Sequence, residues 1–338
     1  MKPIVRLGIT FALITAGEFV VFGHYNSLFN TKAVQAEQTV VTMRNAPPHL
    51  TGIHLMNDRV AAVSSDGSSF AYIDPNNVLH VLDTSSHQEI YKLQLGYQPI
   101  FIKWITGTYL FIGTEDTSGG LVNLRLSTIE IGTGTVRLIN NFSGYLQGST
   151  FKKVTFSPYT NDVYILIGGP TATVLYHYGT NSSGGSTDLS NVDLGGRFVS
   201  NLSVTSTTNN LYFQDLSQGT PNLLVYANHQ VSLIQRNSVL LRVVNDTMYY
   251  GTLNSNGMVT TVYKYEKGTA SKLLDLPNPT DPKNVFVNNQ GQVITIGTNS
   301  FVNLSTHKTT QVGSTDTLIK KNNALLDLSS NGKLTIYS

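Results

Sequence analysis

The chain has 338 residues, of which 40% are apolar and only 12% are charged, and it carries a formal net charge of +2 and no cysteine. The lack of cysteine excludes disulfides, thiolate zinc sites and cysteine nucleophiles. Basic residues are scattered, with no run longer than Lys152-Lys153 or Lys320-Lys321, so the sequence offers no phosphate-backbone footprint and argues against nucleic acid as a partner.

The only long apolar run covers residues 3–22, "PIVRLGITFALITAGEFVVF". About 20 such residues can cross a bilayer. Lys2 and Arg6 stand at its start, so the positive-inside rule predicts that this end stays in the cytoplasm. Glu18 interrupts the run near its outer end, where a carboxylate can reach the headgroups. We therefore interpret residues 1–23 as a transmembrane anchor or a signal peptide, and the polar residues 24–37 as a linker.

Several alternatives to a retained anchor remain open. Cleavage after Gly17 in "ITAGEF" or after Ala36 in "AVQAEQ" would suit a signal peptidase. Cleavage and retention both export the chain, so we expect the remainder on the extracytoplasmic side of the cell membrane, or secreted. Otherwise, the apolar run forms a buried N-terminal helix or docks an intracellular partner.

Strand patterns dominate from residue 38 onward. The runs "AAVSS", "SFAYID", "VLHVLD" and "EIYKLQL" are joined by polar turns at residues 65–67 and 74–77, which predicts a four-stranded antiparallel meander. Comparable units begin near residues 100, 153, 201, 240 and 284. A period of about 40 to 50 residues with four strands in each unit is typical of propeller blades.

Both ends of the repeat region are incomplete. Residues 317–338 supply three strands, and residues 38–43, "QTVVTM", supply a lone one. We expect this lone strand to complete the last blade, with Val40 and Val41 beside Leu334 and Ile336. The prediction is an all-β propeller over residues 38–338 with seven four-stranded blades, closed by pairing of the N-terminal strand with the C-terminal blade. Six blades would result if the second and third units shared strands.

One turn and its flanks carry a family resemblance. "SSDGSSFAYID" followed by "LHVLD" resembles the repeat of TolB and WD40-like propellers, in which a Ser-Pro-Asp-Gly turn leads into a strand. The pattern is echoed at residues 156, 288 and 329. Ser65 replaces the proline of the turn, no Gly-His pair occurs from residue 38 onward, and the chain has no Trp-Asp pair. The resemblance implies a propeller fold and no particular activity.

The sequence contains no linear catalytic or metal signature. His-Glu-x-x-His, Gly-x-Ser-x-Gly, the phosphate-binding loop and the calcium loop are all missing. We therefore assign no catalytic residue, metal site or cofactor, and the binding residues stay unknown. Acidic pairs at Glu115-Asp116 and at Asp188 with Asp193 offer oxygen ligands for calcium. Each pair also fits an ordinary solvated turn, which is the preferred interpretation.

Four other side chains are notable. His177 lies between Tyr176 and Tyr178, just before the loop "GTNSSGGSTD", and this aromatic trio suits sugar stacking or peptide binding. Packing between blades is the preferred alternative for the trio. Trp104, the only tryptophan, is expected in the inter-blade core. His80 and Asp83 are expected to form a structural hydrogen-bond network.

These features predict a non-catalytic module that binds or scaffolds protein or cell-envelope polysaccharide. The alternative function is an extracytoplasmic hydrolase or lyase whose acids converge at the central channel. Three or more carboxylates or histidines at one channel mouth would favour the enzyme. An apolar, Ser-lined channel would favour binding.

Overall fold

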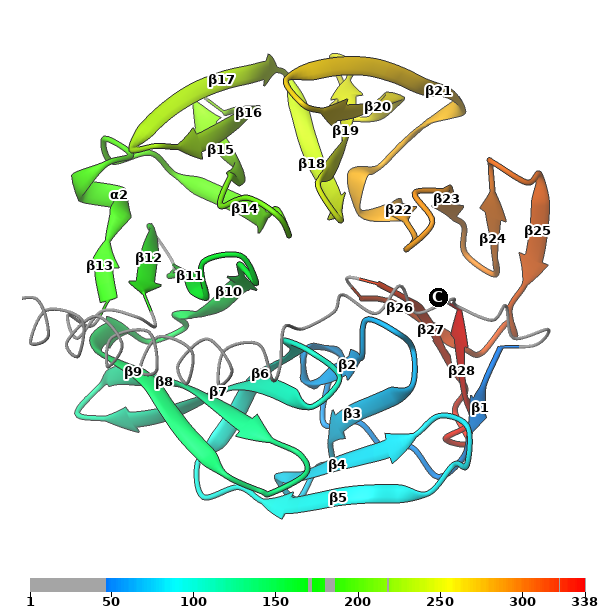
Figure 1. Cartoon of the computed structure of the whole chain (residues 1–338). Helices are drawn as coiled ribbons and strands as arrows, with labels where there is room; N and C mark the ends of the chain where they lie inside the picture. The colour runs from blue at the N-terminus through cyan, green and yellow to red at the C-terminus, as the bar shows by residue number, and fades with distance from the viewer. Residues whose placement is uncertain (1–46, 170–171, 180–185, 218, 322, 338) are drawn as a thin grey trace, which may run out of the picture. The chain divides into compact units, whose positions relative to one another are not determined.

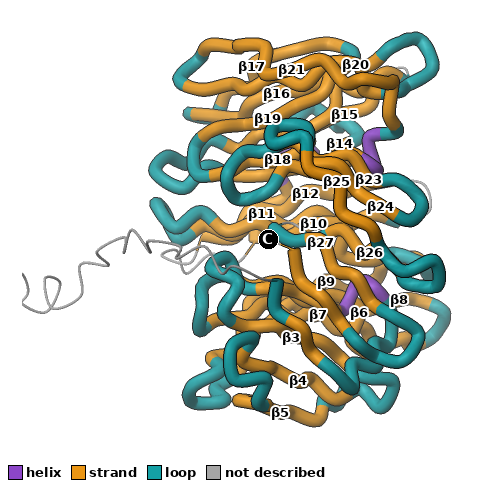
Figure 2. The backbone as a smooth tube through the Cα atoms, turned by 90° about the vertical axis from the view of Figure 1, so that its right-hand side faces the viewer, coloured by secondary structure: helices purple, strands orange, loops and turns teal. Residues whose placement is uncertain are grey.

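The computed structural model describes residues 47–169, 172–179, 186–217, 219–321 and 323–337. Seven four-stranded antiparallel sheets are arranged in a ring around a central axis, which confirms the predicted seven-bladed propeller (Figure 1). In blades 1–6 the first strand in the chain lies nearest the axis and later strands follow outward, whereas in blade 7 the N-terminal strand of the chain lies outermost. Seen edge-on, the strands lie between two faces made of turns and loops (Figure 2).

The strands follow the predicted units closely. Blades 1 and 2 contain β2 (Ala61–Val63), β3 (Ser69–Ile73), β4 (Val78–Asp83), β5 (Glu89–Gln94), β6 (Gln98–Trp104), β7 (Tyr109–Ser118), β8 (Leu121–Glu130) and β9 (Val136–Leu146). Blades 3 and 4 contain β10 (Thr150–Phe156), β11 (Asp162–Gly168), β12 (Thr173–Gly179), β13 (Ser186–Asp188), β14 (Val199–Val204), β15 (Leu211–Ser217), β16 (Thr220–Ala227) and β17 (Gln230–Arg236).

The remaining blades complete the ring. Blades 5 and 6 contain β18 (Ser238–Val244), β19 (Thr247–Leu253), β20 (Val259–Glu266), β21 (Thr269–Thr280), β22 (Val285–Val287), β23 (Val293–Ile296), β24 (Ser300–Asn303) and β25 (Lys308–Gln311). Blade 7 contains β26 (Thr317–Lys320), β27 (Leu325–Leu328), β28 (Leu334–Tyr337) and β1 (His49–Leu50). Three short helical turns are η1 (Asp58–Val60), α2 (Leu189–Val192) and η2 (Pro282–Asn284).

The core consists of seven apolar clusters, one between each pair of neighbouring blades. Successive residues of a strand point to opposite faces of the sheet. Tyr164 therefore packs toward blade 4 while Ile165 packs toward blade 2. In the same way Leu325 joins the cluster with blade 6, and Leu326 joins the cluster with blade 1. Both faces of each blade are buried, so the middle strands have continuous apolar sequences.

A two-residue strand closes the ring. In β1, His49 pairs with Thr335 and Leu50 pairs with Leu334 of β28. Leu50 is buried in the cluster between blades 7 and 1. Backbone bonds from Ile53 N to Gly332 O and from Ile336 N to Pro48 O extend the contact. The predicted mode of closure is confirmed, but Leu50 and Pro48 occupy the places beside Leu334 and Ile336 where Val40 and Val41 were expected. The expected strand at 38–43 lies outside the described residues.

Among the residues that the structure describes, no helix is long and apolar enough to cross a membrane. The predicted anchor at 1–23 and linker at 24–37 fall outside those residues.

Of the four repeat-like turns, those following residues 64, 157 and 288 join the first and second strands of a blade, whereas the turn at 329–332 joins β27 to β28. That fourth echo therefore has a different place in its blade.

Candidate functional site

A cavity of about 870 Å³ occupies the centre of the ring. The innermost strands of all seven blades contribute to its lining. Eight of the chain's 22 Lys and Arg residues line it, whereas the described lining residues include no Asp, Glu or His. These eight residues are Arg59, Lys103, Lys152, Lys153, Arg242, Lys283, Lys320 and Lys321.

The cations come from six of the seven blades. Lys103 lies on β6, Lys152 and Lys153 on β10, and Arg242 on β18. In blades 1 and 6 the charged residue precedes the innermost strand instead, in the 3-10 turns η1 and η2. Blade 4 contributes neutral residues of β14 at the equivalent place. The inner strands therefore bring cations that are far apart in the sequence together on the wall of one cavity.

Strand alternation explains how Lys103 reaches the cavity. Its neighbours Ile102 and Trp104 are both buried in the cluster between blades 1 and 2. Lys103 must therefore point to the opposite side of β6, toward blade 3. There its Nζ donates a 2.7 Å hydrogen bond to Val154 O on β10.

Several of these cations donate hydrogen bonds to backbone carbonyls of a neighbouring blade. An innermost strand has a partner on one side only, so carbonyls on its free edge need another donor. Arg242 Nη1 donates to Val287 O at 2.6 Å, and Lys320 Nζ donates to Val285 O at 3.0 Å. Lys321 Nζ donates to Asp58 O. The cations thus connect blades and also collect positive charge in the cavity.

Burial, and for the two lysines also repulsion from other cations, lowers the pKa values of three residues that line the cavity. Burial, together with the positive charges of Lys153 and Arg242, lowers the pKa of Lys103 to about 7. Burial, with repulsion from Lys320 and Arg242, lowers the pKa of Lys153 to about 8. Burial lowers the pKa of Arg242 to about 10. We call Lys103, Lys153 and Arg242 the cation cluster; all three side chains are half-buried.

Two carboxylates outside the cavity lining partly offset the lowered pKa values of Lys320 and Lys321. Burial lowers the pKa of Lys320 to about 8, although Asp281 acts in the opposite direction. Burial also lowers the pKa of Lys321 to about 8, against the attraction of Asp58. Neither carboxylate is among the residues that line the cavity. The cavity therefore has an excess of positive charge.

Neutral side chains that line the cavity also donate hydrogen bonds to backbone carbonyls of neighbouring blades. Trp104 Nε1 donates to Ala62 O at 3.1 Å, while its ring is buried between blades 1 and 2, which confirms the expected inter-blade position. Asn201 Nδ2 donates to Leu240 O at 3.0 Å, and Asn323 Nδ2 donates to Ser64 O at 2.6 Å. Such side chain to backbone bonds connect the strands that line the cavity.

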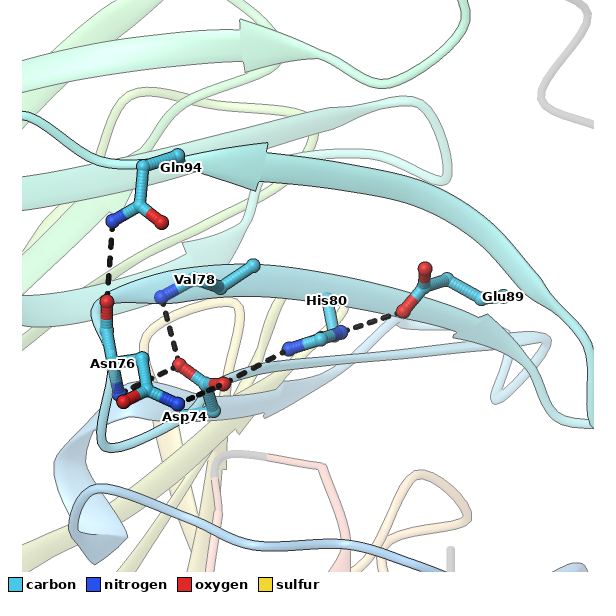
Figure 3. Close-up of polar contacts among 6 residues, drawn as sticks. All are labelled: Asp74, Asn76, Val78, His80, Glu89 and Gln94. Atoms are coloured by element: carbon cyan, nitrogen blue, oxygen red, sulfur yellow. Dashed lines mark hydrogen bonds and ion pairs between the residues drawn. The ribbon is translucent and has the colours of Figure 1, made fainter.

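A second polar group lies on blade 1, on strands away from the axis. His80 Nδ1 is 2.6 Å from Glu89 Oε2, and His80 Nε2 is 3.5 Å from Asp74 Oδ2 (Figure 3). The imidazole stacks on Tyr72 with ring centroids 4.8 Å apart. The expected structural role of His80 therefore involves Asp74 and Glu89, while Asp83 accepts bonds from the backbone of Ser85 and Ser86.

The aromatic trio near residue 177 packs within the ring. Tyr176 contacts Phe142 of blade 2, and its hydroxyl is 2.7 Å from that of Tyr145. His177 stacks on Tyr164 of its own blade, with centroids 5.1 Å apart. Packing between blades is confirmed for Tyr176.

The acidic pairs do not come together in a site. Glu115 and Asp116 lie inside strand β7, so the expected turn is wrong, and adjacent residues of a strand point to opposite faces. Asp193 accepts a hydrogen bond from Tyr226, whereas Asp188 ends β13. In the part of the chain that the structure describes, no three His, Asp or Glu side chains are grouped so that they could hold a metal ion.

The cationic cavity was missed by sequence reasoning because its residues are spread over more than 260 positions, from Arg59 to Lys321. A usable signal was present. "FIKWI", "KKVTF", "LLRVV" and "LIKK" each place a cation within or beside an apolar first strand. Charged residues in strands buried on both faces are unusual and require a local explanation.

The arrangement can attract and hold negative charge, because mutually repelling cations in a partly enclosed space gain energy from a counterion. No known family model matches the chain, and comparison with curated proteins finds no match.

Proposed function

We propose that this protein is a non-catalytic binding module that takes an anionic ligand or anionic part of a partner into its central channel. The observation that carries the proposal is the lining: eight cationic side chains and, among the described lining residues, no acidic one. The propeller fold supports a binding or scaffolding role in general.

Electrostatic focusing supports this choice of ligand charge. Outside the cavity the chain has 14 Lys and Arg residues against 20 Asp and Glu residues, so its attraction for an anion is concentrated in the cavity. Charge of one sign in a cleft with low-dielectric walls raises the local concentration of counterions. Acidic polysaccharide or an acidic protein segment fits this requirement, whereas a neutral glycan would leave the repulsion in place.

A hydrolase or lyase remains the alternative function. The enzyme expected from the sequence has acids or histidines that converge at the channel, and the described lining residues contain none. We therefore favour binding. The observation that would reverse this preference is turnover of an anionic polysaccharide by the purified protein.

The proposal also covers the cellular location of the protein and its relationship to other propellers. We place the ring outside the cytoplasmic membrane, because residues 1–23 have the length and flanking charges of an anchor or signal peptide. A distant kinship to TolB and WD40-like propellers is supported by the first turn. There Asp66 Oδ1 accepts from Ser68 N at 3.0 Å, and Gly67 has a φ of 73°.

The test is binding of a soluble polyanion by the whole protein. Low-molecular-weight dextran sulfate should bind, with affinity that falls as salt rises, and neutral dextran should not. The double variant Lys103→Met/Lys153→Met should weaken this binding by at least tenfold. Its matched control is Lys264→Met/Lys308→Met, which removes two exposed lysines outside the cavity. Equal losses in both variants would contradict a channel site.

A further inference from the structure

We propose that the cation cluster of Lys103, Lys153 and Arg242 is a binding site for a compact oxyanion with two negative charges on one centre, namely a phosphate monoester or related phosphate group. This inference rests on the proposed function and assigns the ligand class and the residues for the same channel.

The cluster draws its charges from separate parts of the ring. Lys103 belongs to blade 2, Lys153 to blade 3 and Arg242 to blade 5. Figure 1 shows β6, β10 and β18 approaching the axis from different directions. Lys103, Lys153 and Arg242 all line the same central cavity. Donors that converge from different directions suit a ligand with oxygens on several sides.

Donor capacity is left over after the structural bonds. An ammonium has three N–H donors, and Lys103 uses one on Val154 O. A guanidinium has five, and Arg242 uses one on Val287 O and one on Asn289 Oδ1. The remaining donors can bind oxygens of an anion. Arg242 in particular can present a bidentate face, which matches phosphate geometry.

Charge matching favours phosphate over carboxylate. A carboxylate brings one negative charge and oxygens in one plane. A phosphate monoester brings nearly two charges at neutral pH and three tetrahedral acceptor oxygens. The cluster can carry three positive charges, so the ligand with more charge on one centre relieves more repulsion.

The same geometry couples binding to protonation. Lys153 on β10 and Arg242 on β18 are the charged groups that act on Lys103, and β2 on its other side carries no titratable residue. The turn η1, which also packs against β6, adds Arg59 and Asp58. Most of the Lys103 amine is neutral at pH 8, because burial and repulsion lower its pKa to about 7. A bound dianion opposes this repulsion, so binding above pH 7 takes up a proton.

The experiment compares three small anions by calorimetry on the whole protein. Phenyl phosphate carries two charges on one centre, whereas phenyl sulfate and benzoate each carry one. Titrations at pH 7, 8 and 9 in two buffers of different ionisation enthalpy measure proton uptake. We expect phenyl phosphate to bind at least tenfold more tightly than either monoanion, with proton uptake at pH 8 and weaker binding at pH 9.

Variants locate the site. Lys103→Met and Arg242→Gln should each weaken phenyl phosphate binding by about tenfold or more, and Lys103→Met should also reduce the proton uptake, with Lys153 accounting for what remains. Arg242→Lys keeps the charge and should bind with intermediate affinity, which preserves the test if Arg242→Gln does not fold. Lys283→Met, in the same lining but outside the cluster, should change affinity less than twofold.

Each result has a defined meaning. If dextran sulfate binds but phenyl phosphate binds no better than benzoate, the phosphate assignment is overturned while the anion-binding function stands. If neither dextran sulfate nor phenyl phosphate binds, both the anion-binding function and the phosphate assignment are wrong. If Lys283→Met weakens phenyl phosphate as much as Lys103→Met, the cluster is not the site. Tight binding without proton uptake would overturn the coupling to Lys103.

Discussion

Lys103 Nζ on the innermost strand of blade 2 donates a 2.7 Å hydrogen bond to the carbonyl oxygen of Val154 on the innermost strand of blade 3. One side chain therefore connects two blades and places a positive charge in the central cavity. The bond contributes to stability, whereas the crowding of charge opposes it. This opposition leads to a pH dependence that can be measured.

The stability of the ligand-free protein should rise as pH increases from 7 to 9. The pKa values of Lys103 and Lys153 are lowered to about 7 and about 8 in the folded ring, against 10.5 for an ordinary lysine. Over this interval the unfolded chain binds more protons than the folded chain, so the free energy of unfolding increases with pH. Below pH 7 the destabilisation is fully present.

Urea unfolding at pH 6, 7, 8 and 9 measures this dependence. In Lys103→Met the increase between pH 7 and 9 should be smaller, because one group that titrates in this range is gone. Exposed Lys264→Met serves as the control and should keep the full increase. A wild-type free energy that stays flat or falls between pH 7 and 9 contradicts the expectation.

At higher pH the stability should fall again. Burial raises the pKa of Tyr164 and of Tyr212 to about 12, above the ordinary value of 10. From about pH 10 the unfolded chain loses phenolic protons that the folded ring retains, so stability is lost progressively as pH rises toward 12. Absorbance at 295 nm during an alkaline titration should show a late, cooperative rise that coincides with loss of the β circular dichroism signal. Phenol ionisation complete by pH 11 in a folded protein would refute this.

Replacement of Gly113 by alanine should destabilise the contact between blades 2 and 3. A Cβ at this position would lie 2.6 Å from Cδ2 of Phe151, which is buried in the core. Overpacking of this kind costs about 1–3 kcal/mol. Gly132→Ala is the matched control, because its added Cβ meets nothing within 4 Å. Thermal unfolding should show a lower midpoint for the first variant only.

Leu50→Ala should weaken the closure of the ring. Leu50 is 1% exposed and packs between blades 7 and 1, so its truncation should cost about 2–5 kcal/mol. Leu146, at 57% exposure on β9, provides a control whose truncation should have little effect. Equal unfolding midpoints in urea for Leu50→Ala and Leu146→Ala would show that β1 does not hold the ring together.

Removal of residues 1–37 should leave a soluble, folded ring, because the closing contacts begin at Pro48 and His49. Removal through residue 53 should instead expose the free edge of β28 and cause aggregation. Gel filtration and circular dichroism of the two truncated proteins distinguish these outcomes. An insoluble product from the shorter deletion would mean that the apolar N-terminal run belongs to the core.

Much of the architecture could be predicted from local patterns. Alternating apolar residues and turn residues such as Asp66-Gly67 mark strands and hairpins, because side-chain direction and positive φ are local properties. The repeat of four strands led to seven blades. The precise closing strand was harder to find, since two residues such as His49-Leu50 are too few to show a period.

The cationic cavity depended on tertiary structure. Lys103 and Arg242 are 139 positions apart, and no local pattern states that their strands approach one axis. By itself the sequence determined the strands, the turns and the repeat, because these follow from the conformational preferences of neighbouring residues. Only the closed ring decided which side chains share a cavity and repel one another, because electrostatic interaction depends on distance in space and on burial.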